Sequence, residues 1–455
     1  MWRGKGCKTI LGSSVMSEPR QENGWLTTEL GRVVNVNPEA LGQSTDPDFG
    51  FRYLDIASVT KGLIDWESLT WHTFQASPSR ARRVLKDGDV VFGTVRPGLQ
   101  SHGYVRDSRQ GPLVGSTGFG VLRAKPGFTH NRYLYHYVMS AHVAAEARRA
   151  EVGSNYPAVN EYDVQRFAIE LPPIDEQRRI ADILDTLDDT IRKTEEIIAK
   201  LQQAKQGLLH DLLTRGIDEN GELRDPERQP EQFKETELGR VPADWGIFRC
   251  VEVSADEPGS MTIGPFGSNL VADDYRTEGV PVVFVRDVRE DGFSWISRVY
   301  VAIGKARELA SHNVRPGDVV ATKMGLPPAV AAVYPSTMPS GIVTADIIRL
   351  RPDLARVRSE WFATYLNSLP VRSQVAAITG GVTRPKITLH DFRNVQVAVP
   401  TLGEQDRLLA ALEGVNERER RERHSLAKLL LLKQGLMDDL LTGRVRIQEA
   451  EEALA

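Results

Sequence analysis

Residues 171–214 read LPPIDEQRRIADILDTLDDTIRKTEEIIAKLQQAKQGLLHDLLT, and residues 399–442 read VPTLGEQDRLLAALEGVNERERRERHSLAKLLLLKQGLMDDLLT. The two stretches align without a gap at a spacing of 228 residues, and 17 of the 44 aligned pairs are identical. Self-similarity over so long a period indicates a repeated structural unit. The chain of 455 residues therefore contains an internal duplication, in which one half repeats the other.

Both copies place aliphatic residues at the spacing of a coiled-coil helix. With Leu184 at heptad position a, eight of the ten a and d positions in the first copy are aliphatic. The second copy keeps this register but has polar Glu419, Glu422 and Lys433 at seam positions. A helix of about 38 residues is about 57 Å long. We predict two long helices that pair with each other; two unrelated amphipathic helices in separate domains are the alternative.

Three further features bear on how these helices begin, end and pair. Thr401 and Glu404 have the spacing of a capping box, and Gly443 stands where a helix is expected to stop. Lys205 and Lys433 occupy heptad a positions. A cation there either specifies the register at a cost in stability or extends its stem to the rim of the helix pair. We favour the second interpretation, because a glycine follows two residues later in each copy and leaves room for a neighbouring helix.

Composition excludes several protein classes. The formal net charge is −4, so no bulk positive charge indicates a nucleic-acid partner. The two cysteines, Cys7 and Cys250, are too few and too far apart for a disulfide framework or a thiolate metal site. No apolar run approaches the roughly 20 residues that span a bilayer, and the opening residues lack the apolar core of a signal peptide. We therefore expect a cytoplasmic protein without a membrane segment.

A globular segment precedes each predicted helix. Each segment opens near a tryptophan, Trp25 or Trp245, and continues with short β-branched runs between Gly, Pro and Asp, which are strand signals. The expected fold class is α+β, with two globular domains separated by two long helices that form an antiparallel coiled coil around a pseudo-twofold axis. The predicted segments are a tail (1–20), the first globular domain (21–170), the first helical region (171–217), a polar linker (218–236), the second globular domain (237–398), the second helical region (399–445) and a tail (446–455).

This order constrains function. Two equivalent halves joined as globule, helix, globule, helix pair their helices antiparallel. A DNA duplex also has local twofold axes, and dimeric readers place two modules on half-sites a fixed distance apart. A rigid spacer with a different globule at each end therefore suits a bipartite site with two different halves.

The chain resembles the specificity subunits of Type I restriction-modification systems. The resemblance rests on the PPIDEQRRI start (172–180) and LLT end of the helical repeat, and on SPSRARRVLKDGDVVFGTVRP (77–97), FKETELGRVPADWG (233–246) and GPFGSNL (264–270). It covers about residues 24–445. It implies that the globules are target-recognition domains on double-stranded DNA. It also implies two methyltransferase (modification) subunits as partners, with restriction subunits added in the full complex. Two departures are the polar stretch 417–424 and Arg215, which intervenes before Gly216.

The sequence contains no recognisable set of catalytic residues. It contains no Asn/Asp-Pro-Pro-aromatic motif of adenine methylation, no G-x-x-x-x-G-K-[ST] loop and no H-E-x-x-H pair. We expect a non-catalytic recognition subunit without a cofactor of its own; the resemblance implies S-adenosylmethionine, ATP and Mg²⁺ in the partner subunits. The alternatives are a recognition subunit of a methylation-only or other defence complex that lacks cleavage, and a coiled-coil scaffold whose globules bind protein.

Candidate DNA contacts come from clustered cations and polar groups, because neither globule carries a large net charge. An arginine fork can read guanine, and asparagine can pair with adenine. The candidates are Arg80, Arg82, Arg83, Lys86, Asn155 and Tyr156 in the first globule, and Ser268, Asn269, Lys323, Arg384 and Lys386 in the second. A solvated charged turn is the alternative for the first cluster. For Tyr156 we favour packing over stacking.

The helix starts offer a candidate partner-binding surface. Glu176 and Gln177 in the first copy match Glu404 and Gln405 in the second. We expect these four residues on the exposed face of the helix pair, where methyltransferase subunits would dock. The alternative is that they cap and solubilise the helix starts.

Overall fold

The computed structural model describes residues 20–22, 24–106, 111–153, 156–379 and 385–447. The chain divides into two compact units: unit 1 comprises residues 1–196 and 424–455, and unit 2 comprises residues 197–423. Two long helices are present, α5 (Ile174–Thr214) and α10 (Leu402–Leu440), and each contributes one part to each unit. The predicted mixture of strand-rich segments and long helices is therefore confirmed. Among the described residues, no helix combines the length and apolar character needed to cross a membrane.

The globule of unit 1 is built from small sheets with short helices packed on them. Its sheets, in strand order, are β1 (Arg20–Glu22), β2 (Trp25–Glu29) and β13 (Ala168–Leu171); β10 (Gly103–Tyr104), β9 (Val90–Gly93), β12 (Phe119–Ala124) and β3 (Val34–Val36); and β7 (Thr70–Thr73), β4 (Gly50–Leu54), β11 (Leu113–Ser116) and β8 (Ala81–Leu85), besides the hairpin of β5 (Val59–Thr60) and β6 (Leu63–Ile64). Only β4 and β11 pair in parallel among these described strands. The helices are α1 (Leu30–Val33), α2 (Asn131–Val138), α3 (Ala141–Ala150) and α4 (Glu161–Gln165).

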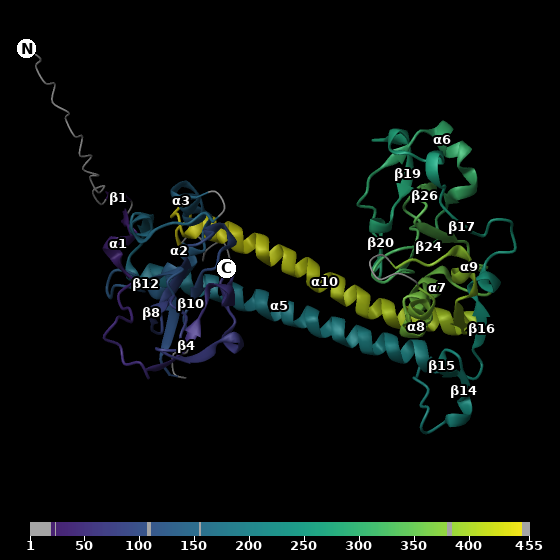
Figure 1. Ribbon diagram of the computed structural model, residues 1–455, viewed down its shortest axis with the longest axis horizontal. Coiled ribbons are helices and arrows are strands. Elements are labelled where there is room, and N and C mark those ends of the chain that lie inside the picture. The colour runs from purple at the N-terminus through teal and green to yellow at the C-terminus, as the bar shows by residue number, and fades with distance from the viewer. Residues whose placement is uncertain (1–19, 23, 107–110, 154–155, 380–384, 448–455) are drawn as a thin grey trace, which may run out of the picture. The chain divides into compact units, whose positions relative to one another are not determined.

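The globule of unit 2 has the same kind of architecture. Its two larger sheets, in strand order, are β17 (Met261–Ile263), β27 (Ile347–Leu350), β24 (Val319–Thr322) and β25 (Ala331–Val333); and β18 (Tyr275–Arg276), β22 (Tyr300–Val301), β19 (Val280–Val283), β26 (Gly341–Val343) and β23 (Asn313–Val314). Three two-stranded pairs accompany them: β14 (Phe233–Thr236) with β15 (Gly239–Pro242), β16 (Gly246–Arg249) with β28 (Gln396–Val399), and β20 (Val288–Arg289) with β21 (Gly292–Phe293). The helices are α6 (Ile303–Glu308), α7 (Ser359–Leu366), α8 (Leu369–Ile378) and α9 (Leu389–Asn394). The β19–β26 sheet lies on the side of this unit away from α10 (Figure 1).

The two globules share one strand order. The sheet β10-β9-β12-β3 corresponds to β25-β24-β27-β17, and β7-β4-β11-β8 corresponds to β22-β19-β26-β23. The parallel pair of β4 and β11 likewise corresponds to that of β19 and β26. A capping box starts α4 at Asn160 and another starts α9 at Thr388, 228 residues later. The repeat therefore extends through the globules, although their sequences diverge.

Each main core includes residues of both long helices. In unit 1, Ile180 and Leu184 of α5 and Leu440 of α10 pack into the core of the globule. In unit 2, Leu212 of α5 and Leu408 of α10 do the same. All five side chains are buried, with at most 1% exposed. Burial of such a side chain contributes roughly 1.5–3 kcal/mol, so the helix ends are anchored where the heptad pattern places aliphatic residues.

Polar residues at the helix seam meet partners on the opposite helix. In unit 1, Lys433 of α10 forms an ion pair with Asp188 of α5. In unit 2, Glu419 of α10 accepts a hydrogen bond from Gln202 Nε2 at 3.2 Å and lies 3.8 Å from Lys205 Nζ. These pairs account for polar positions in the middle of the second helix. Because both lysines pair across the seam, the contacts support the register interpretation rather than the one favoured above.

Candidate nucleic-acid interface

In unit 1 an exposed arginine and tyrosine are held together by two loops that are distant in sequence. The loop after β9 pairs with the segment before α4 through a β-bridge between Val95 and Ala158 and a 2.7 Å hydrogen bond from Arg96 N to Pro157 O. The Arg96 guanidinium lies over the Tyr156 ring, 4.6 Å from its centroid. Tyr156 is 70% exposed, so it stacks on a cation rather than packing in the core, and the packing expectation is wrong.

The same loop pair recurs in unit 2 with other side chains. Met324, after β24, forms a β-bridge with Lys386, before α9. Gly325 N donates to Pro385 O at 3.4 Å, in the place of the hydrogen bond made by Arg96. Lys323 follows β24 directly, and its Nζ lies 4.8 Å from the ring centroid of the exposed Phe266. Each globule therefore presents a cation beside an exposed aromatic ring at this loop pair, although Phe266 comes from a third segment, after β17.

Two other predicted residues of unit 2 lie beside this loop pair. Ser268 and Asn269 belong to a short 3₁₀ helix, Gly267–Asn269, and both are exposed. Lys386 is also exposed, at the bridge itself. Asn155 and Arg384, which were predicted as contacts too, lie outside the described residues. The structure thus gathers four of the five predicted residues of the second globule on or next to one loop pair.

The predicted cation cluster of the first globule is divided by a strand. Arg82 and Arg83 lie in β8, where successive side chains point to opposite faces. Arg82 covers the Phe74 ring at 4.8 Å, whereas Arg83 lies 4.0 Å from Glu161. Arg80 is exposed just before the strand. The expected cluster is therefore divided between the two faces of a strand, and the alternative of a charged turn does not describe Arg82 and Arg83.

Lys86 is engaged within its own globule. Its ammonium pairs with Glu39, which also binds Arg123. The Lys86 ammonium and the Arg123 guanidinium hold the pKa of the Glu39 carboxyl below its usual range. Part of the Lys86 charge is thus balanced locally, and Arg80 and Arg82 remain the more available cations of this region.

The predicted partner-binding glutamines are buried. Gln177 is 1% exposed and Gln405 is 0% exposed, so the expectation that they lie on an outer face is wrong. Gln177 accepts a 2.7 Å hydrogen bond from His130 N and donates to Phe128 O and Pro172 O. Gln405 makes the equivalent three bonds, to Arg358 N, Arg356 O and Pro400 O. Each amide therefore ties the first turn of a long helix to backbone groups of its globule.

Glu176 is also turned inward in unit 1. Its carboxylate accepts from Trp25 Nε1 at 3.3 Å and from Arg446 Nε and Nη2 at 2.9 and 2.8 Å. Arg446 follows the end of α10, so this contact joins the start of one helix to the segment after the other. Together with the pair of Asp188 and Lys433, it makes the two helix segments antiparallel within this unit.

Glu404 occupies the matching place in unit 2 and is 1% exposed. It accepts from Trp245 Nε1 at 3.2 Å, from Ile217 N at 3.1 Å and from the Arg224 guanidinium at 2.6 and 3.1 Å. Thr401 caps α10 by accepting from Glu404 N at 3.3 Å. The Glu404 carboxylate binds Trp245, Ile217 and Arg224 instead of the helix start. Only the Thr401 contact of the expected capping box is therefore present.

The segment 218–236, predicted as a polar linker, carries structure of its own. Arg224, within it, binds Glu404 as described, and Ile217 forms a β-bridge with Leu223. Gly216 has a φ of 64°, and a Cβ there would lie 2.8 Å from the Trp245 ring and closer still to Glu404. The chain therefore leaves α5 through a close contact that requires glycine.

Known proteins resemble this chain in sequence. The family model "Type I restriction modification DNA specificity domain" matches residues 80–203. A putative type I restriction enzyme specificity subunit, MjaX of Methanocaldococcus jannaschii, is 22% identical over 93% of this chain and 94% of its own length. The EcoDI specificity subunit of Escherichia coli is 21% identical over 93% of this chain and 89% of its own. The chain is thus similar, over nearly its whole length, to specificity subunits of type I restriction-modification systems.

Solved structures agree with this fold. A chain from a study of complex assembly and conformational transition of the type I restriction-modification system has a TM-score of 0.61 and 25% identity, covering 93% of this chain and 98% of that one. The HsdS subunit from Thermoanaerobacter tengcongensis has a TM-score of 0.50, 24% identity and the same coverage. The likeness runs through both units and both long helices.

Sequence reasoning missed two residues at the loop pairs. Neither Arg96 nor Phe266 was among the predicted DNA contacts. A signal was present for both: Arg96 directly follows a strand of the first globule, and Phe266 lies within the quoted GPFGSNL motif. What the sequence lacked were the tertiary contacts that bring Arg96 to Tyr156 and Phe266 to Lys323, pairs about 60 positions apart.

Proposed function

We propose that this chain is the DNA sequence-specificity subunit of a Type I restriction-modification complex, and that each globule reads one half of a bipartite site. One observation carries the proposal: the same loop pair recurs in both globules, with Arg96 over Tyr156 at one and Lys323 over Phe266, from a neighbouring segment, at the other. Cations position phosphates, and exposed rings stack on or wedge between bases. A shared loop pair with different side chains suits two half-sites of different sequence.

The long helices then have two roles. As an antiparallel coiled coil they set the number of unread base pairs between the half-sites, and they carry two methyltransferase subunits. Restriction subunits complete the complex for cleavage. S-adenosylmethionine, ATP and Mg²⁺ belong, on this proposal, to those partners. The antiparallel pairing within each unit supports this arrangement, and the buried helix starts leave the docking surface to other positions on the helices.

The chain is proposed to be non-catalytic. The purified chain alone should therefore methylate no adenine, cut no DNA and hydrolyse no ATP. Addition of its methyltransferase partner should produce methylation at one bipartite sequence, which can be mapped by sequencing modified bases in a host that expresses both. Methylation by the chain alone would contradict the assignment of catalysis to the partners.

A domain exchange tests the division between half-sites. Replacing residues 237–398 with the corresponding domain of a relative should change one half of the methylated sequence and spare the other. Assembly with the methyltransferase, followed by gel filtration, serves as the control for folding. A change in both halves would show that the globules do not read separately.

A further inference from the structure

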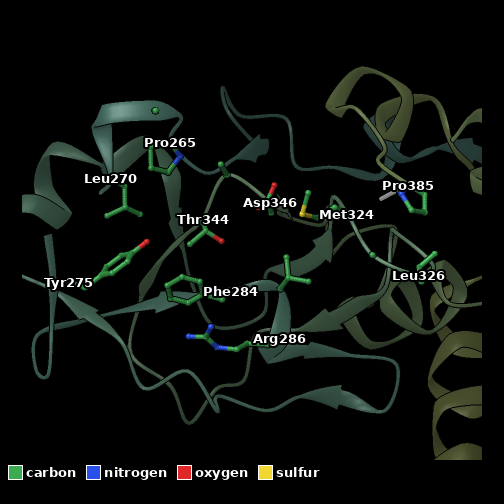
Figure 2. Close-up of a pocket in the computed structure, with 14 residues that line it drawn as sticks. Pro265, Leu270, Tyr275, Phe284, Arg286, Met324, Leu326, Thr344, Asp346 and Pro385 are labelled. Carbon is green, nitrogen blue, oxygen red and sulfur yellow. The ribbon is translucent and has the colours of Figure 1, made fainter. Parts of the chain in front are cut away.

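The second globule contains a pocket next to its loop pair. The pocket has a volume of about 710 Å³, within the range of roughly 300–1,000 Å³ that is usual for small-molecule sites. Met324 and Leu326 line one side, and Leu270 lies with the rings of Tyr275 and Phe284 towards the other (Figure 2). The two rings meet edge to face with centroids 5.6 Å apart. They form an aromatic corner against which a planar group can pack.

Polar groups are few at this pocket. The Thr344 hydroxyl donates to Val283 O at 2.9 Å. Arg286 covers the Phe284 ring at 4.6 Å, and its Nε donates to Ser297 Oγ at 2.7 Å. Among the described residues, the half-buried Asp346 carboxylate has no hydrogen bond or ion pair. A partly desolvated carboxylate without a donor favours a ligand that brings one.

The rim of the pocket belongs to the proposed DNA surface. Met324 lines the wall and pairs with Lys386 in the β-bridge, while Lys323 precedes it with its ammonium over Phe266. Gly267 also lines the pocket, next to the exposed Ser268. Phosphates held by the two lysines would place a nucleotide at the mouth. An apolar side chain of a protein partner would instead leave the Asp346 carboxylate unpaired, so it fits the site less well.

We propose that this pocket takes one unstacked base of the half-site read by the second globule, a base that carries an exocyclic amino group. The base packs in the corner of Tyr275 and Phe284, and its amino group donates to the Asp346 carboxylate. Carboxylates accept from amino groups of bases in this way, and aromatic side chains stack bases out of the duplex. Extrusion of a base costs a few kcal/mol, which favours steps that unstack readily. This inference rests on the proposed function.

The test uses the chain assembled with its methyltransferase subunits. Once the methylated sequence is mapped, 2-aminopurine is placed in turn beside each base of the second half-site, so that it reports the unstacking of its neighbour while the tested base keeps its own amino group. Fluorescence should rise severalfold on binding at one position besides the methylated adenine, because unstacking relieves quenching. No such position in a complex that methylates normally would overturn the pocket inference and leave the proposed function standing. A complex without site-specific methylation would overturn both.

Asp346→Asn separates the carboxylate from the rest of the pocket, since it keeps the shape of the side chain and removes its charge. The fluorescence rise at the identified position should disappear, and affinity for the site should fall by about tenfold, as expected for one base contact. Asp291→Asn, at an exposed position in the same globule, is the matched control and should change neither. An unchanged signal in Asp346→Asn, an equal loss in the control, or a loss of subunit assembly would each overturn the inference.

Discussion

At the scale of single residues, Tyr156 and Arg96 make the sharpest prediction for DNA binding. Stacking of a base on an aromatic side chain is worth about 1–3 kcal/mol by alanine substitution. Tyr156→Ala should therefore weaken binding of the assembled complex to its site by roughly 5- to 150-fold. Fluorescence anisotropy with a labelled duplex at fixed salt measures this loss.

Tyr162 supplies the matched control for this prediction. It is 51% exposed, and Arg166 covers its ring at 5.3 Å, so it is another exposed tyrosine beneath an arginine in the same unit. It lies in α4 rather than in the loop pair. Tyr162→Ala should leave the affinity nearly unchanged. Equal losses in both variants would assign the effect to general perturbation of the globule rather than to the loop pair.

The buried His102 makes a prediction about pH and stability. Its ring stacks on Phe92 at 4.2 Å, its Nδ1 accepts from Gly93 N at 3.0 Å, and burial lowers its pKa from 6.5 to about 4. The unfolded chain therefore takes up a proton at this residue below pH 6.5, whereas the folded chain does so only below about pH 4. The stability that the neutral ring contributes is complete above pH 6.5 and is lost as the pH falls towards 4, by about 3 kcal/mol in all.

His102→Asn isolates this contribution, because asparagine keeps an acceptor for Gly93 N and does not titrate. The free energy of unfolding, measured by urea titration between pH 7.5 and 4.5, should fall less steeply in the variant. His130 and His136, whose pKa values burial also lowers, titrate in both proteins and cancel in the difference. Parallel pH profiles would contradict the burial argument.

The cation cluster shows where sequence reasoning stopped at this scale. Arg80, Arg82 and Arg83 are neighbours in sequence, which suggested one charged surface. The pleat of β8 sends Arg82 and Arg83 to opposite faces, and each finds its own partner, Phe74 or Glu161. A strand assignment for residues 81–85 would have predicted the division. No sequence pattern identified Glu161 as a partner, because that contact spans 78 positions and depends on the folded globule.

At the scale of elements, the two carboxylates at the helix starts predict unequal consequences for matched substitutions. In unit 2 the side chains of Glu404 and Arg224 are 2% and 10% exposed; in unit 1 those of Glu176 and Arg446 are 15% and 37% exposed. Removing one member of a buried pair leaves an uncompensated charge and costs about 3–5 kcal/mol, whereas an exposed pair is worth about 0–1 kcal/mol. Arg224→Met should therefore destabilise its unit by several times more than Arg446→Met destabilises the other.

Hydrogen exchange followed by peptide mass spectrometry checks this comparison unit by unit. Peptides around Trp245 should lose protection in Arg224→Met, and peptides around Trp25 should change little in Arg446→Met. Arg228→Met is the control, since that side chain is 87% exposed and pairs only with Asp225 among the described residues. Equal effects of Arg224→Met and Arg228→Met would show that the segment 218–236 is a tether after all.

The long helices were the elements that the sequence predicted best, because their heptad pattern is local and was repeated. Ile180 and Leu184, predicted at seam positions, are buried as expected. The role of Glu404 was not predictable from the same pattern. The capping-box spacing to Thr401 was real, but a buried tryptophan and arginine from distant segments compete for the carboxylate. Local spacing identifies the helix start; tertiary contacts decide what its side chains do.

At the scale of the whole molecule, the proposed coiled coil makes a prediction about the spacer between half-sites. One heptad added to each helix preserves the a and d seam and lengthens each helix by about 10.5 Å. The insertions must lie opposite each other. Since Asp188 pairs with Lys433, Thr194, six residues later, faces the stretch six residues earlier, near Ala427. Insertion after Thr194 and after Ala427 also leaves the contacts of Gln202 with Glu419 untouched.

The rise of DNA is about 3.4 Å per base pair, so 10.5 Å corresponds to about three base pairs. Three base pairs also rotate the groove by roughly 100°, given about 10.5 base pairs per turn, and a heptad in the seam does not supply that rotation. The double insertion should therefore yield either the same two half-sites with a spacer two to three base pairs longer, or loss of methylation while the subunits still assemble.

A single insertion after Thr194 serves as the control, because it breaks the register of the pair and should impair assembly itself. Mapping of methylated bases in cells that carry each variant distinguishes these results. Full activity of the double insertion on the original spacer would show that the helices do not set the distance between half-sites.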